Sequence, residues 1–154
     1  ADIPNVVDVM LDKTNIQDYT FKSKLPIQIR MTDLDTFNHV NNGVLSAYFD
    51  LGRLNYLKQV TGNVNLTTLD LVLVHTEYDF FASVRFQSKI IVETKIVDFG
   101  NKSLKMLQRI VDEQDENKCY CTCFSVLSGY DHQHDCSQVI DSHFKELVKA
   151  FEQI

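Results

Sequence analysis

The chain lacks long apolar runs, an excess of positive charge and low-complexity segments. No apolar run approaches the roughly 20 residues that a membrane-spanning helix needs, and the N-terminus has neither the basic start nor the continuous apolar stretch of a secretion signal. Fifteen basic against twenty-one acidic residues give a net charge of −6, which argues against nucleic-acid binding through phosphate neutralisation. We therefore expect a soluble cytoplasmic protein with no nucleic-acid or membrane partner.

Glycine and proline are also scarce, with five and two residues, and no internal repeat or linker divides the chain. At 154 residues, of which 44% are hydrophobic, the chain is long enough for one domain that buries roughly two-thirds of its unfolded surface. We expect a single domain over residues 1–154. Residues 1–16 show no clear periodicity and are interpreted as an N-terminal arm or a short helix.

Three of the four cysteines lie at alternate positions, Cys119, Cys121 and Cys123, close to His132 and His134. In an extended strand this spacing puts the thiols on one face about 6.6 Å apart, too far for thiolates that share one tetrahedral zinc. We interpret them as small buried residues that let a helix pack closely, and a reducing compartment argues against disulfides. We expect no metal and no other cofactor.

The hydrophobic pattern predicts an α+β protein. Apolar residues at spacings of three and four predict a mostly buried helix over residues 43–60 and a second helix at the C-terminus. Alternating and β-branched segments predict five strands, one before the long helix and four consecutive antiparallel strands after it, with a two-residue hairpin at Gly100-Asn101. The expected strands are residues 21–31, 69–81, 89–99, 103–111 and 118–127, and the second helix is residues 137–154.

A polar stretch, "DLDTFNHVNN" (residues 33–42), separates the first expected strand from the long helix. Asn41 or Asn42 is a suitable N-cap for that helix. Asp33 is interpreted as structural. Polar groups are thus concentrated where two buried elements meet, which is a favourable place for a functional site.

The run "TDLDTFNHVNNGVLSAYFDLGR" (residues 32–53) resembles the signature of hotdog-fold thioesterases of the 4-hydroxybenzoyl-CoA thioesterase type, which include acyl-CoA and acyl-ACP thioesterases. Their motif reads roughly D-x-D-x-x-x-H-V-N-N. With the strand and hairpin pattern that follows, the resemblance covers about residues 24–128. It implies an antiparallel sheet wrapped around a long central helix, a homodimer or homotetramer, and hydrolysis of an acyl thioester in a cleft between subunits.

The resemblance assigns catalytic roles to positions in the polar stretch. Asp35 matches the catalytic carboxylate, and His39 matches a histidine that supports it in the plant acyl-ACP enzymes. Two positions differ from these relatives. Phe37 stands where the plant enzymes have asparagine, and Asn42 stands where bacterial relatives have a catalytic histidine.

Further site residues also follow from the resemblance. Glu77 aligns with a glutamate on the first strand after the helix and is a candidate catalytic acid, and Asp50 aligns with an acidic residue on the helix. Lys102, in a segment with a local charge of +3, is the candidate for the coenzyme A phosphates. The candidate substrate-binding residues are Asn41, Gly43, Asp50, Lys102 and Ser103.

The expected chemistry needs neither metal nor serine. A thioester carbonyl is electrophilic enough for a positioned carboxylate such as Asp35 to attack it, or to deprotonate a water that does. Helix N-terminal amides near Asn42 and Gly43 are suitable donors to the oxygen that gains negative charge.

Three alternatives to an acyl-CoA thioesterase stay open. The first is an acyl-ACP thioesterase. The second is a non-catalytic protein that binds acyl thioesters, favoured by the departures at Phe37 and Asn42. The third is a hydratase or dehydratase on a similar fold, in which only His39 or His75 has the chemistry required.

Overall fold

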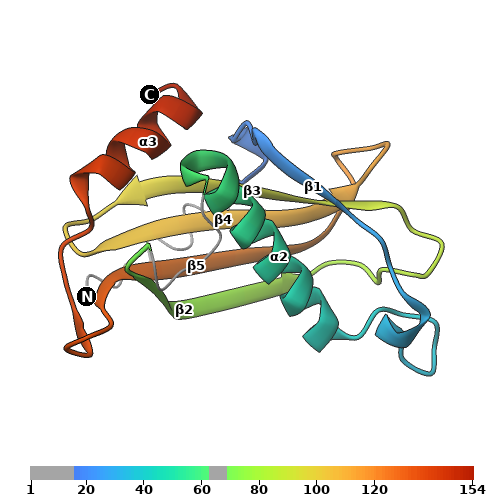
Figure 1. Cartoon of the computed structure of the whole chain (residues 1–154). Coiled ribbons are helices and arrows are strands. Elements are labelled where there is room, and N and C mark those ends of the chain that lie inside the picture. Colours follow the sequence, from blue (N-terminus) through green and yellow to red (C-terminus); the bar gives the residue numbers. More distant parts are fainter. Residues whose placement is uncertain (1–15, 63–68) are drawn as a thin grey trace.

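A long helix lies across the concave face of a curled antiparallel sheet, and a shorter helix covers one end (Figure 1). The computed structural model describes residues 16–62 and 69–154, so the expected arm lies outside the described residues, except for Ile16. This is the expected α+β layout. The elements are β1 (Ser23–Ile27), α2 (Asn42–Thr61), β2 (Leu71–Phe80), β3 (Ile90–Phe99), β4 (Ser103–Asp112), β5 (Cys119–Asp131), β6 (Cys136–Ser137), α3 (Ser142–Glu152) and the 3-10 turns Ile16–Asp18 and Met31–Asp33.

The strand order in the sheet is β1-β3-β4-β5-β2, with the short β6 paired to β5. The four strands after the long helix all form close to their expected bounds, but they are not consecutive neighbours as predicted. β2 pairs with β5 instead of β3, so it forms one edge of the main sheet. Residues 81–89, which include a turn closed by the Ser88 amide on the Arg85 carbonyl at 3.0 Å, connect β2 to β3 and carry the chain to the other side of the sheet.

The caps of α2 explain where this helix begins and ends. The Asn41 side chain accepts a hydrogen bond from the Gly43 amide at 2.7 Å, which confirms Asn41 as the N-cap. Gly62 follows the helix in the left-handed region, with φ of 78°, where glycine carries no steric penalty.

The closest approach between α2 and the sheet occurs at Gly52. A Cβ atom at this position would lie 2.4 Å from Val92 Cγ1, so only glycine lets the helix pack here. Along the same face, side chains at spacings of three and four bury against β3, β4 and β5. They are Leu45, Tyr48, Phe49, Tyr56, Leu57 and Val60.

Three local predictions need correction. β1 ends at Ile27 instead of residue 31, because the chain turns into a 3-10 turn that Asp33 ties to Arg30. The β3–β4 hairpin has three connecting residues, with the Gly100 amide bound to the Ser103 carbonyl at 2.7 Å. The three thiols do not share one face: a register shift near Cys119 breaks the alternation, so Cys119 lines the outer face while Cys121 lies beneath α2.

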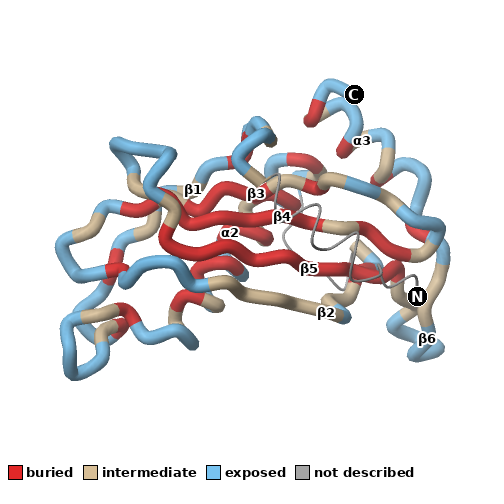
Figure 2. The backbone as a smooth tube through the Cα atoms, turned by 180° about the vertical axis from the view of Figure 1, so that it is seen from behind, coloured by how far each residue is buried: buried red, intermediate tan, exposed pale blue. Residues whose placement is uncertain are grey.

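The central strands are buried on both faces. Seen from behind, β3, β4 and β5 are buried along most of their length, whereas most residues of β2 are half-buried and two, Val74 and Phe80, are exposed (Figure 2). On this outer face, Phe21 packs on Leu107, Phe124 and Val126. None of the helices in the described residues combines the length and apolar character required to cross a bilayer.

Candidate active site

The polar stretch folds into a narrow hairpin at the N-terminus of α2. The Asp35 amide donates to the His39 carbonyl at 2.7 Å, and the Asn41 amide donates to the Asp33 carbonyl at 3.0 Å. Asn38 supplies the left-handed residue of the turn, with φ of 61°. The Val40 amide donates to the Val84 carbonyl at 2.7 Å, so the segment after β2 holds the hairpin in place.

Asp35 presents one occupied and one unoccupied carboxylate oxygen. Oδ1 accepts the Phe37 amide at 2.9 Å and the His39 amide at 3.1 Å. These backbone hydrogen bonds, Phe37 first, hold the pKa of Asp35 below its usual value. Oδ2 accepts no hydrogen bond from the described residues. The side chain is therefore ionised at neutral pH and has one oxygen available for substrate or water.

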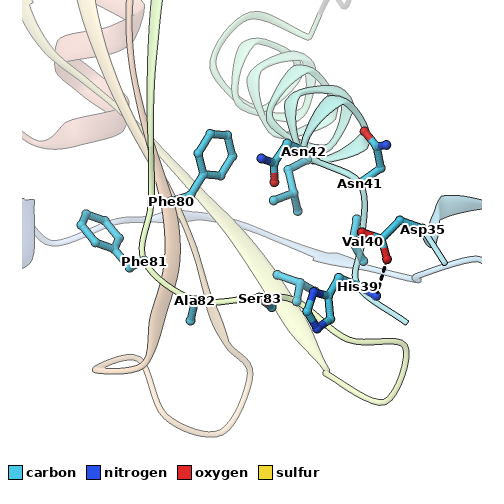
Figure 3. A pocket seen from close by; sticks show the side chains of 11 residues that line it. Asp35, His39, Val40, Asn41, Asn42, Phe80, Phe81, Ala82 and Ser83 are labelled. Carbon is cyan, nitrogen blue, oxygen red and sulfur yellow. Dashed lines mark hydrogen bonds between the residues drawn. The ribbon is translucent and has the colours of Figure 1, made fainter. Parts of the chain in front are cut away.

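A pocket of about 570 Å³ opens between the hairpin, the first turn of α2 and the segment after β2 (Figure 3). It brings together Asp35, His39, Asn41 and Asn42 from the predicted set. The Asn42 side chain points from the helix toward Phe80 on the opposite wall (Figure 3). The remaining lining residues are mostly apolar: Val40, Leu45, Phe80, Phe81, Ala82, Ser83 and Val84.

The N-terminus of α2 offers one uncommitted backbone donor. The Gly43 amide is occupied by the Asn41 side chain, and the Val44 and Leu45 amides donate to the Asn41 carbonyl. The Asn42 amide has no acceptor among the described residues, which leaves it for a ligand oxygen. Of the two backbone amides considered as donors from the sequence, those of Asn42 and Gly43, only the Asn42 amide is unoccupied among the described residues.

Asp33, two residues before Asp35, has the opposite environment. It is 2% exposed and accepts the Tyr48 hydroxyl at 2.5 Å, the Arg30 amide at 3.0 Å and the Arg30 guanidinium at 3.0 Å. Burial opposes its ionisation, but the hydrogen bonds from Tyr48 and Arg30 hold the pKa of Asp33 below its usual value. The Tyr48 contact fastens the hairpin to α2 and the Arg30 contacts close the 3-10 turn before it, in agreement with a structural role.

His39 orders the hairpin through its backbone. Its amide and carbonyl both bond to Asp35, and it forms a β-bridge with Arg85. The half-buried imidazole lines the pocket (Figure 3).

Glu77 is not near Asp35 within one chain. Its carboxylate lies 3.0 Å from His75 Nε2 and it stands opposite Phe124, on the outer face of the sheet. Asp50 lies on α2 with its side chain 61% exposed, and it bonds Arg53 at 2.6 Å. Each residue is thus already paired with a neighbour.

Lys102 and Ser103 lie at the other end of the sheet. Ser103 begins β4, whereas Ile110 of the same strand lies beside the pocket end. Seven residues of strand separate these positions by about 23 Å. A single chain therefore does not bring Lys102 to the pocket that contains Asp35.

Among the pocket residues that were not predicted from the sequence, two are aromatic. Phe80 and Phe81 are 47% and 65% exposed, although phenylalanine is usually buried. The sequence pattern places both of them at the end of the strand expected over residues 69–81. Only their position at an edge strand reveals that they form a pocket wall.

The family of the chain is shown by its sequence. Residues 29–148 match the model of the thioesterase-like superfamily. The chain belongs to this superfamily. The expectation of a thioester hydrolase is thereby confirmed at the level of the family. No curated protein sequence matches the chain significantly.

Solved structures, several of them of thioesterases, share the fold, which confirms the hotdog assignment. A Thermus thermophilus thioesterase in complex with coenzyme A and zinc is 22% identical, with a TM-score of 0.78 over 87% of this chain and 96% of that one. A Staphylococcus aureus protein in complex with coenzyme A is 12% identical, with a TM-score of 0.75 over 85% and 84%. A 1,4-dihydroxy-2-naphthoyl-CoA thioesterase from Synechocystis is 13% identical, with a TM-score of 0.72 over 81% and 93%.

Metal ligands are not grouped in the described part of this thioesterase-like chain. Within residues 16–62 and 69–154, no three His, Cys, Asp or Glu side chains are arranged to hold a metal ion. His134 and Asp131 do contact each other, at 2.6 Å, on the exposed β5–β6 turn.

Proposed function

We propose that the protein is an acyl-CoA thioesterase in which Asp35 acts on the thioester carbonyl. The observation that carries the proposal is the unoccupied Oδ2 of an ionised Asp35 in the same pocket as the unoccupied Asn42 amide. One group supplies electrons to the carbonyl carbon, and the other stabilises the oxygen that gains charge. Both belong to one rigid hairpin and helix start.

Two routes begin from the ionised carboxylate. In the first, Oδ2 attacks the carbonyl, the carbon–sulfur bond breaks to release coenzyme A, and water hydrolyses the resulting anhydride. In the second, Asp35 takes a proton from the water that attacks. Single-turnover hydrolysis in ¹⁸O-water tests the first route, because ¹⁸O enters the Asp35 carboxylate only when water attacks the Asp35 carbonyl carbon of the anhydride.

Coenzyme A is the carrier that we propose. Two of the neighbours described above contain coenzyme A and the third acts on a CoA ester, whereas none concerns acyl carrier protein. We assign Asn42 to the carbonyl oxygen, through its amide and its side chain. His39 holds Asp35 in place, and Asn41 and Gly43 shape the helix start.

We also propose that a homodimer is the working unit. β2 is a ten-residue strand at the sheet edge with most of its residues half-buried, which is a suitable edge for pairing with a second copy. Asp35 is exposed to water in one chain, and a partner would cover it. We assign any role of Glu77, Lys102 or Ser103 at Asp35 to such a partner, because Glu77 lies on the outer face of the sheet and the other two lie at its opposite end. Asp50 lies on the same helix as Asn42, about two turns further along.

The direct test is thiol release by the purified protein from short, long and aromatic acyl-CoAs, with its mass in solution measured at the same concentration. We expect release from at least one acyl-CoA and a mass of two chains or a multiple. Tight binding of acyl-CoA without thiol release would instead favour the non-catalytic alternative. A strict monomer that turns over substrate would contradict the shared cleft.

A further inference from the structure

A second cavity, of about 400 Å³, lies at the same end of the sheet as the Asp35 pocket. Arg85, Lys89 and Lys118 contribute basic side chains to its lining, and Asp112 contributes the single carboxylate. Three positive charges and one negative charge give a local charge of +2, in a chain whose net charge is −6. The other lining residues are uncharged: Gln87, Ser88, Gln114 and Tyr120.

The three basic side chains of this hollow have no carboxylate partner in the described part of the chain. Lys118 forms no salt bridge among the described residues: its Nζ lies 5.2 Å from the centroid of Tyr120, and its positive charge is one of the smaller causes that lower the pKa of Asp112. Asp112 is held by other donors, namely the Gln114 amide at 2.9 Å and the Tyr120 hydroxyl at 3.1 Å. Other basic residues of the protein do have carboxylate partners: Lys24, Arg30, Arg53, Lys95, Lys105, Arg109 and Lys149.

The hollow is continuous with the pocket along one segment. Residues 80–84 line the pocket, and the next residues, from Arg85 to Lys89, line the hollow. Five residues from Val84 to Lys89 span at most about 18 Å. The pantetheine arm of coenzyme A has about as many backbone bonds as four extended residues, which reach roughly 14 Å. Because Arg85 forms a β-bridge with His39, which pairs with Asp35, the hollow begins beside the hairpin, and we expect a pantetheine arm that starts at Asp35 to reach it.

From this geometry we propose that Arg85, Lys89 and Lys118 bind the phosphates of the coenzyme A nucleotide. The proposal rests on the proposed function, and it identifies the feature by which the protein recognises its carrier. Within one chain, these three residues take the role expected for Lys102, because Lys102 lies at the opposite end of the sheet. Phosphate oxygens supply the negative charge that these side chains lack, and arginine can bind them through two parallel hydrogen bonds.

The test compares acyl-CoA with the corresponding acyl-pantetheine, which has no nucleotide. The double variant Arg85→Ala/Lys118→Ala should raise KM for acyl-CoA about tenfold with little change in kcat, and the rise should be confined to the substrate that carries the nucleotide. Added salt should raise the wild-type KM for acyl-CoA more than that of the variant. The matched control, Lys58→Ala/Lys149→Ala, removes the same charge from exposed helix positions.

Several results would overturn the proposal. They are an equal rise in KM for acyl-pantetheine, an equal rise in KM for acyl-CoA in the control variant, and the same rise in KM from Lys102→Ala. A rise in KM of the double variant that is seen only with a thioester of acyl carrier protein would also overturn it. Calorimetric titration with coenzyme A and with adenosine 3′,5′-bisphosphate tests the hollow independently of catalysis. If wild type hydrolyses no thioester, the proposed function fails. The hollow would then be supported only if both ligands bind wild type about tenfold more tightly than the variant, and any other result would refute it.

Discussion

The two ends of the sheet use their polar groups differently. Among residues 16–62 and 69–154, Asp35 Oδ2 and the Asn42 amide, beside the N-terminus of α2, have no hydrogen-bond partner, and the basic side chains of the hollow have no salt-bridge partner. At the other end, the Tyr56 hydroxyl and Lys95 both bind the buried carboxylate of Glu152, at 2.7 and 2.9 Å, and thereby fasten α3. Buried polar groups are normally satisfied inside a protein. Glu152 is buried and is satisfied by protein groups, whereas Asp35 is exposed, so its free oxygen is satisfied by water until a ligand replaces that water.

The largest effect should come from Asp35→Asn, which keeps the shape of the side chain but removes its charge. We expect thioester hydrolysis to fall by about 10² or more, since a positioned acid, base or nucleophile contributes on that scale. The melting temperature should stay close to that of wild type. His39→Ala is the comparison and should cost less, because the imidazole is not needed for its backbone contacts. Wild-type turnover by folded Asp35→Asn protein would refute the role of Asp35.

Asp33→Asn tests the neighbouring carboxylate at the same end of the sheet. It weakens hydrogen bonds to Tyr48 and Arg30 in a buried position, so we expect a loss of about 2 kcal/mol in the free energy of unfolding. Urea denaturation measures this loss. Once the variant is folded, its kcat should fall much less than that of Asp35→Asn. A stable variant with a hundredfold lower kcat would show that the two aspartates do not have separate roles.

Tyr56→Phe tests the opposite end. The substitution removes the hydroxyl that donates to Glu152 and leaves a buried carboxylate with Lys95 as its remaining side-chain partner, so we expect a loss of about 1 kcal/mol in stability. KM and kcat should stay within twofold of wild type. A strong effect on KM would mean that this end of the sheet also contacts substrate.

The smallest effect concerns pH. The pKa of Asp35 is lowered from its ordinary value of 3.8. The reactive carboxylate is therefore fully present above pH 3.8 and is lost only as the pH falls through the lower pKa of the folded protein. We expect kcat/KM to change less than twofold between pH 7 and pH 5. A fall in kcat/KM centred near pH 6.5 would instead indicate that a histidine titrates in the rate-limiting step.

The pKa of Asp33 is also lowered by folding, so its ionised form stabilises the folded protein. This contribution to the free energy of unfolding should be retained above pH 3.8 and lost as the pH falls below it.

The secondary structure and part of the site were predictable from the sequence for local reasons. The α2 helix is specified by the Asn41 cap, Gly62 and the apolar spacing, all within 22 residues of chain. The Asp35 hairpin is likewise local, and its motif indicated the family. The position of β2 was not predictable, because strand pairing depends on partners far apart in sequence. The register shift at Cys119 was missed for the same reason.

The sequence by itself determined which elements form, where the long helix begins, and that a carboxylate precedes it. These features depend on hydrogen bonds and side-chain periods within a few residues. Only the tertiary structure decided which polar groups remain uncommitted. It placed Asp33 against Tyr48, left Asp35 facing a pocket wall supplied by Phe80, and gathered Arg85 and Lys118 into one hollow. Whether a charge is satisfied depends on what folding brings beside it, and those neighbours come from distant parts of the chain.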